Sequence, residues 1–361
     1  MSNRKLDLEE KFGQMILLGL DVYDLNDELV KIIKQYHIGG VVLYKKNYTS
    51  VDTMISFINK LKEINGDRIP LFIAIDQENG KVNRFPKDIE RMYNAFKLAN
   101  TKDLNIINEV NVLTTYLLKS VGVNMNFAPV LDIYRNENNK AIGNRSYGKN
   151  IDDIINYGLL FMKEMQKNNI VSVVKHFPGH GITSTDSHFV LPKIKNIELL
   201  EKEDLQVFYK SIENGADAIM VGHLKLEGYG KDAASINKEI IDKYLISKNY
   251  NGLIVTDDLR MKSLSLLEKI ENNVKKSIEA GNNLILIKYQ KGDFKLYDKL
   301  LKMVKNGMIN QDCINNSADK IIYYKEKYKM SNELIINNLD IEKINKKIIE
   351  LNEYIDNISN D

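Results

Sequence analysis

Short runs of apolar, mostly branched residues recur along the chain, and longer amphipathic stretches separate them. The runs lie at residues 13–20, 40–43, 71–76, 126–130, 171–177, 218–222, 253–257 and 284–287. Most of them are continuous rather than alternating, which is typical of parallel strands that are buried on both faces of a sheet. The intervening stretches carry apolar residues at helical spacing, at 27–36, 51–64, 151–166, 197–214, 238–248 and 264–280.

Strands that alternate with helices eight times predict an α/β fold, a right-handed and closed (β/α)8 barrel of the TIM type. The 361 residues suit one such barrel. An open doubly wound sheet is the alternative, since the number of strands does not prove closure, but no GxGxxG follows the first strand. We assign residues 1–330 to a single catalytic barrel domain and expect residues 331–361 to form a charged helical tail.

Composition narrows the range of partners. The chain has 51 basic and 49 acidic residues, a formal net charge of +2, so nucleic acid is not an expected partner. Cys313 is the only cysteine, which excludes an intrachain disulfide. Acidic residues interrupt the N-terminal segment where a secretory signal needs an apolar stretch, and no window matches a membrane helix. We therefore expect a cytoplasmic monomer that does not bind membranes.

Polar residues interrupt the apolar runs at their C-terminal ends. In a barrel these ends converge on one mouth, where enzymes of this fold carry their active sites. Charged groups that close apolar strands need water, partners or a substrate. The position alone therefore favours an enzyme, and the residues concerned are Asp76, Asp132, Lys175, His176, His223, Asp257 and Asp258.

The segment 175–188 reads KHFPGHGITSTDSH. Pro178 and two glycines prevent a helix, so it should form a long loop after the fifth strand. Asp186 lies two residues before His188, a spacing that lets the carboxylate hold one ring nitrogen and fix the tautomer. The other ring nitrogen would then be free to act on a substrate.

This loop resembles the signature of the β-N-acetylglucosaminidases of glycoside hydrolase family 3. Further segments look like family segments in family order over roughly residues 10–328, among them IDQENGKVNRF (75–85), GNRSYG (143–148) and GLIVTDDLRM (252–261). The chain departs from the family pattern at Asn79, where a glycine is usual, and at Asn283, where an aspartate is common. Asn tolerates left-handed backbone angles, so Asn79 can replace that glycine at modest cost.

The resemblance implies a role for each matching residue. Asp257 matches the nucleophile, whereas its neighbour Asp258 should face away or orient the loop. His188, oriented by Asp186, matches the acid/base. The positions that hydrogen-bond the sugar hydroxyls in the family are matched by Asp76, Arg84, Arg145, Lys175 and His176.

The implied reaction is a retaining double displacement that needs no cofactor and no metal. Asp257 attacks the anomeric carbon, His188 protonates the leaving oxygen, and neutral His188 then activates water. The implied substrate is a saccharide with a terminal β-linked N-acetylglucosamine, such as GlcNAc–anhydroMurNAc or a muropeptide from cell-wall recycling. A phosphorylase that uses phosphate in place of water at the same site is a close alternative.

Two more distant alternatives remain. His176, His180, Asp186 and His188 offer the nitrogen and oxygen donors of a zinc-dependent hydrolase, although Pro178 and the two glycines of the loop prevent His176 and His180 from sharing one helix face. A carbohydrate-binding barrel without catalysis would have no need of Asp257, Asp186 and His188 together. Taken singly, Asp76 could be a helix N-cap, Arg84 and Arg145 could form surface ion pairs, and His223 could be a satisfied strand-end histidine.

Overall fold

A computed structural model describes residues 5–359 except 136, 138, 184–190 and 266–267. In these residues one eight-stranded parallel sheet has the order β10-β1-β2-β3-β4-β5-β7-β9. All eight predicted strands are present, as β1 (Ile16–Leu20), β2 (Gly40–Leu43), β3 (Phe72–Ile75), β4 (Met125–Asn126), β5 (Val171–Phe177), β7 (Ala218–Val221), β9 (Leu253–Thr256) and β10 (Ile285–Lys288).

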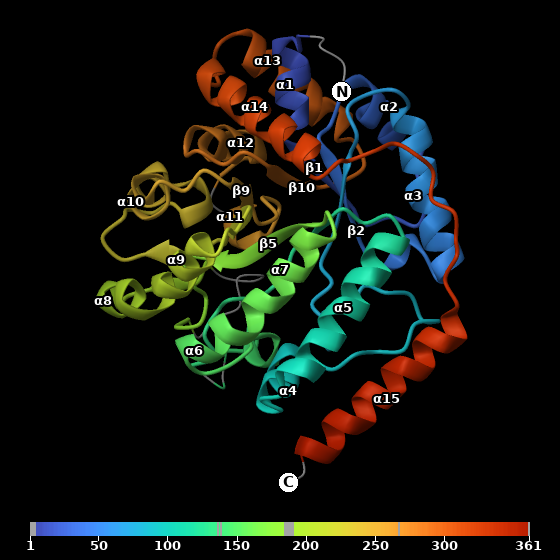
Figure 1. Cartoon of the computed structure of the whole chain (residues 1–361). Coiled ribbons are helices and arrows are strands. Elements are labelled where there is room, and N and C mark those ends of the chain that lie inside the picture. Colours follow the sequence, from blue (N-terminus) through green and yellow to red (C-terminus); the bar gives the residue numbers. More distant parts are fainter. Residues whose placement is uncertain (1–4, 136, 138, 184–190, 266–267, 360–361) are drawn as a thin grey trace.

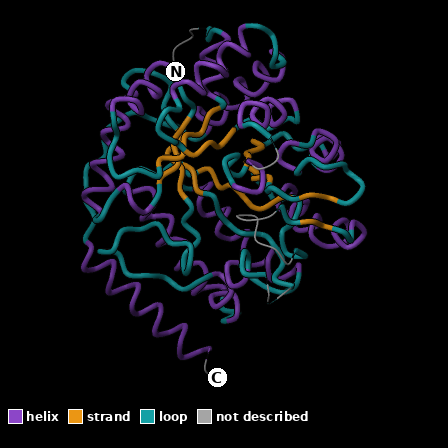
Figure 2. Tube along the Cα trace, turned by 180° about the vertical axis from the view of Figure 1, so that it is seen from behind, coloured by secondary structure: helices purple, strands orange, loops and turns teal. Residues whose placement is uncertain are grey.

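The two edges of the sheet meet, which closes the barrel. A parallel bridge joins Val255 of β9 to Leu284, and the Thr256 N–H donates to the Leu284 carbonyl at 2.9 Å. The (β/α)8 barrel is thereby confirmed, and the open sheet is not observed. Seen from behind, the strands occupy the centre and helices surround them (Figure 2).

The predicted start of the first strand was wrong. Residues 13–14 belong to helix α1 (Leu8–Gln14), which a capping box between Asp7 and Glu10 initiates. Gly13 packs so closely on the turn after α2 that an added Cβ would lie 1.9 Å from the Tyr36 carbonyl oxygen. Only a glycine fits there, so its role is close packing and not the opening of a strand.

The predicted helices are all present, some of them divided. They are α2 (Asp27–Gln35), α3 (Val51–Asn65), α6 (Ile151–Asp153) with η3 (Ile154–Gly158) and α7 (Leu159–Lys167), α8 (Ile197–Leu199) with η4 (Leu200–Asp204) and α9 (Leu205–Glu213), α10 (Lys238–Tyr244) with η6 (Ile246–Lys248), and α11 (Lys262–Ser265) and α12 (Ile270–Glu279) (Figure 1). Two further helices follow β10, α13 (Phe294–Lys305) and α14 (Gln311–Lys327).

Several elements were not foreseen. Two are full helices after β3, α4 (Ala95–Asn100) and α5 (Leu104–Ser120), and α5 shields that side of the barrel. Smaller ones lie in the loops: η1 (Lys45–Asn47), η2 (Gly143–Arg145), η5 (Ala234–Ile236), and the parallel pair β6 (Lys193–Ile194) and β8 (Lys225–Leu226). Each of these smaller elements follows the C-terminal end of a barrel strand, so together they build up the mouth.

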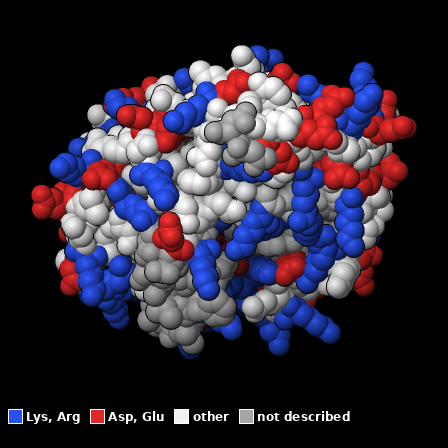
Figure 3. Space-filling view, turned by 90° about the horizontal axis from the view of Figure 1, so that it is seen from below, with Lys and Arg blue, Asp and Glu red and all other residues white. Residues whose placement is uncertain are grey.

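Beyond α14 the chain continues to a final helix, α15 (Ile341–Ser359), which packs against α4 and α5. A helix in the tail agrees with the expected pattern, whereas a domain boundary after residue 330 stays a prediction. No helix in the described part of the chain is long and apolar enough to cross a membrane. The face seen from below carries both acidic and basic side chains, and Lys and Arg gather in its lower half (Figure 3).

Candidate active site

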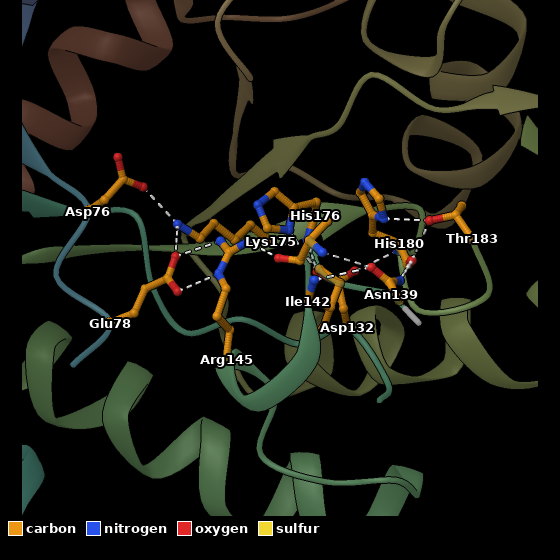
Figure 4. Close-up of polar contacts among 11 residues, drawn as sticks. Asp76, Glu78, Asp132, Asn139, Ile142, Arg145, Lys175, His176, His180 and Thr183 are labelled. Atoms are coloured by element: carbon orange, nitrogen blue, oxygen red, sulfur yellow. Dashed lines mark hydrogen bonds and ion pairs between the residues drawn. The ribbon is translucent and has the colours of Figure 1, made fainter. Parts of the chain in front are cut away.

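The mouth of the barrel holds a buried ion network. The Lys175 ammonium near the end of β5 lies 2.7 Å from Asp76 and 2.5 Å from Glu78, two carboxylates that follow β3. Glu78 also accepts two N–H bonds from Arg145, which η2 carries, each at 2.7 Å (Figure 4). One carboxylate therefore fixes two cations from different loops.

Glu78 is ionised despite its burial. Burial acts to raise the pKa of the Glu78 carboxyl, but the charges of Arg145 and Lys175 and their hydrogen bonds outweigh it. The net result holds the pKa well below its usual range. Arg145 donates a further N–H to the Ala141 carbonyl at 2.6 Å, so its guanidinium is held in one orientation.

Asp132, after β4, organises the next part of the site. Its Oδ2 lies 2.7 Å from Nδ1 of His176, and its Oδ1 accepts the backbone N–H of His180 at 2.6 Å. Burial acts to raise the pKa of Asp132, but the adjacent His176 and these hydrogen bonds hold it below its usual range. Since an ionised carboxylate only accepts, Nδ1 of His176 carries a proton and leaves Nε2 available.

Asp257 follows β9 directly and is partly exposed at the mouth. Its Oδ1 accepts the backbone N–H of Asp258 at 2.7 Å, and Oδ2 has no hydrogen bond to a described residue. Burial acts to raise the pKa of the Asp257 carboxyl. The charges of His223, His176 and Lys175 and the hydrogen bond from the Asp258 N–H outweigh burial, so the pKa lies below its usual range. Asp257 is thus an ionised carboxylate with one oxygen available, which is what a nucleophile requires.

Asp258 has a different environment from Asp257. Its Oδ1 accepts the backbone N–H groups of Arg260 and Lys288 at 3.0 and 3.1 Å, so the carboxylate ties the β9 loop to the end of β10. Burial, reinforced by the charge of Asp257, raises its pKa above the usual range. His223 bonds Ser235 and the Asp258 carbonyl at 2.7 and 2.8 Å, as expected of a satisfied strand-end histidine.

Arg84 lies in the loop after β3. Its backbone N–H donates to Oε1 of Gln77 at 2.7 Å, and its carbonyl accepts from the Tyr48 hydroxyl at 2.9 Å. Its Nε is buried and has no partner among the described residues. The surface ion pair that Arg84 could have formed is therefore not observed within this part of the chain, and the guanidinium remains available.

Asp186 and His188 lie outside the described residues, so the predicted dyad has no structural description. Of the four residues of the zinc alternative, His176 and His180 are described, and both have other contacts. Nδ1 of His176 lies against Asp132, and Nδ1 of His180 lies 2.6 Å from the Thr183 hydroxyl. Among the residues described, no three His, Cys, Asp or Glu side chains form a group that could hold a metal ion.

Comparison with known proteins identifies the family. A family model described as the glycosyl hydrolase family 3 N-terminal domain matches residues 7–323. The chain belongs to glycosyl hydrolase family 3. It is therefore a glycoside hydrolase, as the resemblance of its motifs implied.

Individual relatives match most of this chain. A β-hexosaminidase of Psychromonas ingrahamii is 28% identical over 278 residues, which cover 75% of this chain and 81% of the relative. A β-hexosaminidase of Haemophilus influenzae is 29% identical over 299 residues, covering 81% and 84%. The structure of a family 3 β-N-acetylglucosaminidase from Paenibacillus sp. str. FPU-7 matches with a TM-score of 0.87 and 29% identity, over 96% of this chain and 69% of that one.

Two residues of this family 3 site were not assigned a role from the sequence. Glu78 lies within the quoted segment 75–85, and Asp132 was noted at a strand end, but neither was included in the predicted site. The available signal was one of charge: the residues predicted to bind the sugar hydroxyls include three cations, Arg84, Arg145 and Lys175, but a single carboxylate, Asp76. Two further carboxylates were needed nearby, one for the cations and one for the histidines.

Proposed function

We propose that this family 3 enzyme is a retaining exo-β-N-acetylglucosaminidase. The observation that carries the proposal is Asp257, an ionised carboxylate at the end of β9 whose Oδ2 has no hydrogen bond to a described residue, beside cations and histidines that suit sugar hydroxyls. The names of the relatives, β-hexosaminidase and β-N-acetylglucosaminidase, support the choice of sugar.

In the first step, Oδ2 of Asp257 forms a bond to the anomeric carbon while the glycosidic bond breaks. His188, as imidazolium, gives its proton to the departing oxygen, and Asp186 holds the ring and favours its charged form. The electron pair of the glycosidic bond leaves with the aglycone, so the products of this step are a free alcohol and a glycosyl-enzyme. The roles of His188 and Asp186 rest on the sequence motif.

The sugar that occupies the site would be held by the groups around the ion network. Asp76 accepts from Lys175 through Oδ1 only, so its other oxygen can accept a sugar hydroxyl. The Arg84 guanidinium and Nε2 of His176 have no described partner and can bind the same ring. Lys175 and Arg145 keep N–H groups beyond those that Glu78 uses, and so contribute fixed donors.

In the second step neutral His188 takes a proton from water, which attacks the anomeric carbon and releases Asp257. The net result is hydrolysis with retention of configuration. By resemblance to intracellular relatives, the aglycone we propose is a cell-wall fragment such as anhydro-N-acetylmuramic acid or its peptides, processed in the cytoplasm by a monomeric enzyme.

A panel of para-nitrophenyl β-glycosides tests the proposal. The β-N-acetylglucosaminide should be cleaved far faster than the β-glucoside or β-xyloside, and NMR of the first product should show the β-anomer. Repeating the assay with inorganic phosphate distinguishes hydrolysis from phosphorolysis, because phosphorolysis would yield the sugar 1-phosphate. An EDTA arm, expected to have no effect, addresses the zinc alternative. A preference for the glucoside, or an α-anomer as first product, would refute the assignment.

A further inference from the structure

The tail after α14 runs along the outside of the barrel towards the mouth. Its first part, residues 331–340, is neither helix nor strand and lies along α3 (Figure 1). Asn332 donates to the carbonyls of Gly66 and Arg68 just past the end of α3, at 2.8 Å each. Further along, Asn337 donates to Asp52 at 2.7 Å, in the first turn of that helix. Helix α3 begins after the C-terminal end of β2 and ends before the N-terminal end of β3. The tail therefore runs from the end of the barrel opposite the mouth to the mouth itself.

There, α15 packs an apolar face on the helices that follow the β3 loop. Ile344, Ile348, Leu351 and Ile355 are buried and recur at helical spacing. They contact α4 and α5, so α15 completes the core on this side. The loop between β3 and α4, residues 76–94, passes beneath the helix.

Side chains of α15 hold the backbone of that loop. Asn345 donates to the Asp88 carbonyl at 2.8 Å and accepts the Glu90 N–H at 2.9 Å. Asn352 donates to the Arg91 carbonyl at 2.8 Å. Two amide side chains therefore satisfy three polar groups of a four-residue stretch that has no secondary structure of its own.

The clamped stretch is tied to the part of the loop that carries the sugar-binding groups. The Gly80 N–H donates to the Met92 carbonyl at 3.0 Å, and the Glu78 N–H donates to the Val82 carbonyl at 3.0 Å. Arg84 lies within the segment that the Gly80–Met92 contact closes, and its guanidinium has no described partner that would fix it otherwise. The position of Arg84 therefore depends on the path of the loop backbone.

We propose that α15 is a clamp on the β3 loop, with Asn345 and Asn352 as positioning residues that set where Arg84 and Glu78 lie in the mouth. The inference rests on the proposed function in one respect, since it takes Arg84 as a ligand of the sugar. A helix 260 residues further along the chain thus contributes to substrate affinity without touching the substrate.

The test compares the double variant Asn345→Ala/Asn352→Ala with Asn337→Ala as matched control. Asn337 belongs to the same tail and makes two hydrogen bonds, to Asp52 and to the Leu339 N–H, but none to the loop. The full-length protein is used throughout. We expect the double variant to raise KM for para-nitrophenyl β-N-acetylglucosaminide by about three- to tenfold, a range set by hydrogen bonds lost from one segment. Its kcat should change less than about twofold, because Asp257 is unaffected.

Limited proteolysis supplies a readout that does not depend on activity. Lys87 and Arg91 are exposed, and the clamped backbone begins directly after Lys87 and ends at Arg91, so trypsin should cut there faster in the double variant, as intact mass analysis would show. The control should match the wild type in both assays. Unchanged proteolysis would overturn the clamp, and faster proteolysis with an unchanged KM would overturn its link to the site. If both variants lose kcat and thermal stability alike, the helix acts only through global stability, and the proposal is wrong.

Failure of the proposed function has a different signature. If the wild type cleaves a different glycoside, the KM ratio is measured with that substrate and the same criteria apply. If it cleaves none, the proposed function fails, and trypsin cleavage at Lys87 and Arg91 alone decides whether the clamp exists.

Discussion

Replacing Glu78 with glutamine removes a charge while keeping the shape of the side chain. The carboxylate is 4% exposed, and the Lys175 side chain that it pairs with is 1% exposed. The Arg145 guanidinium, at 17%, loses the partner of two hydrogen bonds. In the Glu78→Gln variant the amide can still accept, but its NH2 group must face a cation. Asp76 is then the one described carboxylate that still pairs with Lys175.

The expected cost follows from the burial of the partners. Breaking a buried ion pair by removing one partner costs about 3–5 kcal/mol, because the remaining charge is uncompensated. With an unfolding entropy of about 2.1 cal/mol/K per residue, the 361-residue chain has about 0.76 kcal/mol/K. Glu78→Gln should therefore lower Tm by about 4–7 °C at pH 7.

Glu203→Gln is the matched control. Glu203 also pairs with an arginine, at 2.5 Å from Arg135, but its side chain is 34% exposed. The Glu203–Arg135 pair is more accessible to solvent than the pairs of Glu78, and an ion pair near the surface contributes less than about 1 kcal/mol, so Tm should fall by about 1 °C or less. Differential scanning calorimetry measures both variants. If the two lose the same amount, or Glu78→Gln loses less than about 2 °C, the cations do not depend on Glu78 and the reasoning fails.

The pH dependence of the Glu78 effect has a defined sign. The folded state holds the pKa of Glu78 below its usual range, so its stabilisation is fully present above the unfolded pKa of about 4.3. It is lost progressively as the pH falls below that value. The Tm difference between wild type and Glu78→Gln should therefore narrow between pH 5 and pH 3, and a difference that widens towards acid would contradict the assigned direction.

Two further predictions address the site, and a third concerns stability. Asp257→Ala should lower kcat by several orders of magnitude, whereas Asp258→Asn should act mainly on Tm; a mechanism-based fluoro-sugar that labels a peptide without Asp257 would show that the nucleophile is wrong. His188→Ala should accumulate glycosyl-enzyme with a dinitrophenyl glycoside and regain turnover when azide is added. His176→Ala, at a residue assigned to sugar binding, should show no rescue by azide. If azide rescues His176→Ala and not His188→Ala, the two roles are reversed. Burial raises the pKa of Asp204 to about 6, so its ionisation costs stability as the pH rises from about 4 to 6. The free energy of unfolding of Asp204→Asn should therefore rise relative to that of the wild type by up to about 3 kcal/mol between pH 4 and pH 7. Urea unfolding measures both proteins, and a difference that stays constant with pH would contradict this.

The strands and several individual residues could be predicted because their signals are local. Continuous apolar runs with polar ends identified all eight strands and the mouth where Asp257 lies. Asn79 was expected to adopt a left-handed backbone in place of glycine, and it has a φ of 69°. Asp258 was expected to orient its loop, and it binds two backbone N–H groups. In each case the evidence lay within a few residues of the position concerned.

The missed features differ in kind. Helix α5 had an adequate local signal, since Ile106, Ile107, Val110, Leu117 and Leu118 are buried at helical spacing, and that signal was overlooked. Gly13 was predicted as the first residue of a strand because an apolar run begins two residues later, at Met15, and the contact that requires a glycine comes from Tyr36. A pattern within one segment cannot reveal a contact made by another.

The ion network shows why charge at the mouth could be located but not assigned from the sequence. Lys175 is separated from its carboxylate partners by about a hundred residues, and Arg145 from Glu78 by sixty-seven. Which acid pairs with which cation depends on how β3, η2 and β5 converge, and that is fixed only when the barrel closes. The same holds for Asn345 and Asn352, whose partners lie more than 250 residues away. Residues of the site that act through a neighbouring side chain therefore emerge from the structure, whereas those that end a strand can be inferred from the strand alone. Asp257 belongs to the second group and Glu78 to the first. Asp132 belongs to both, because its place at a strand end was recognised from the sequence and its contacts with His176 and His180 were not.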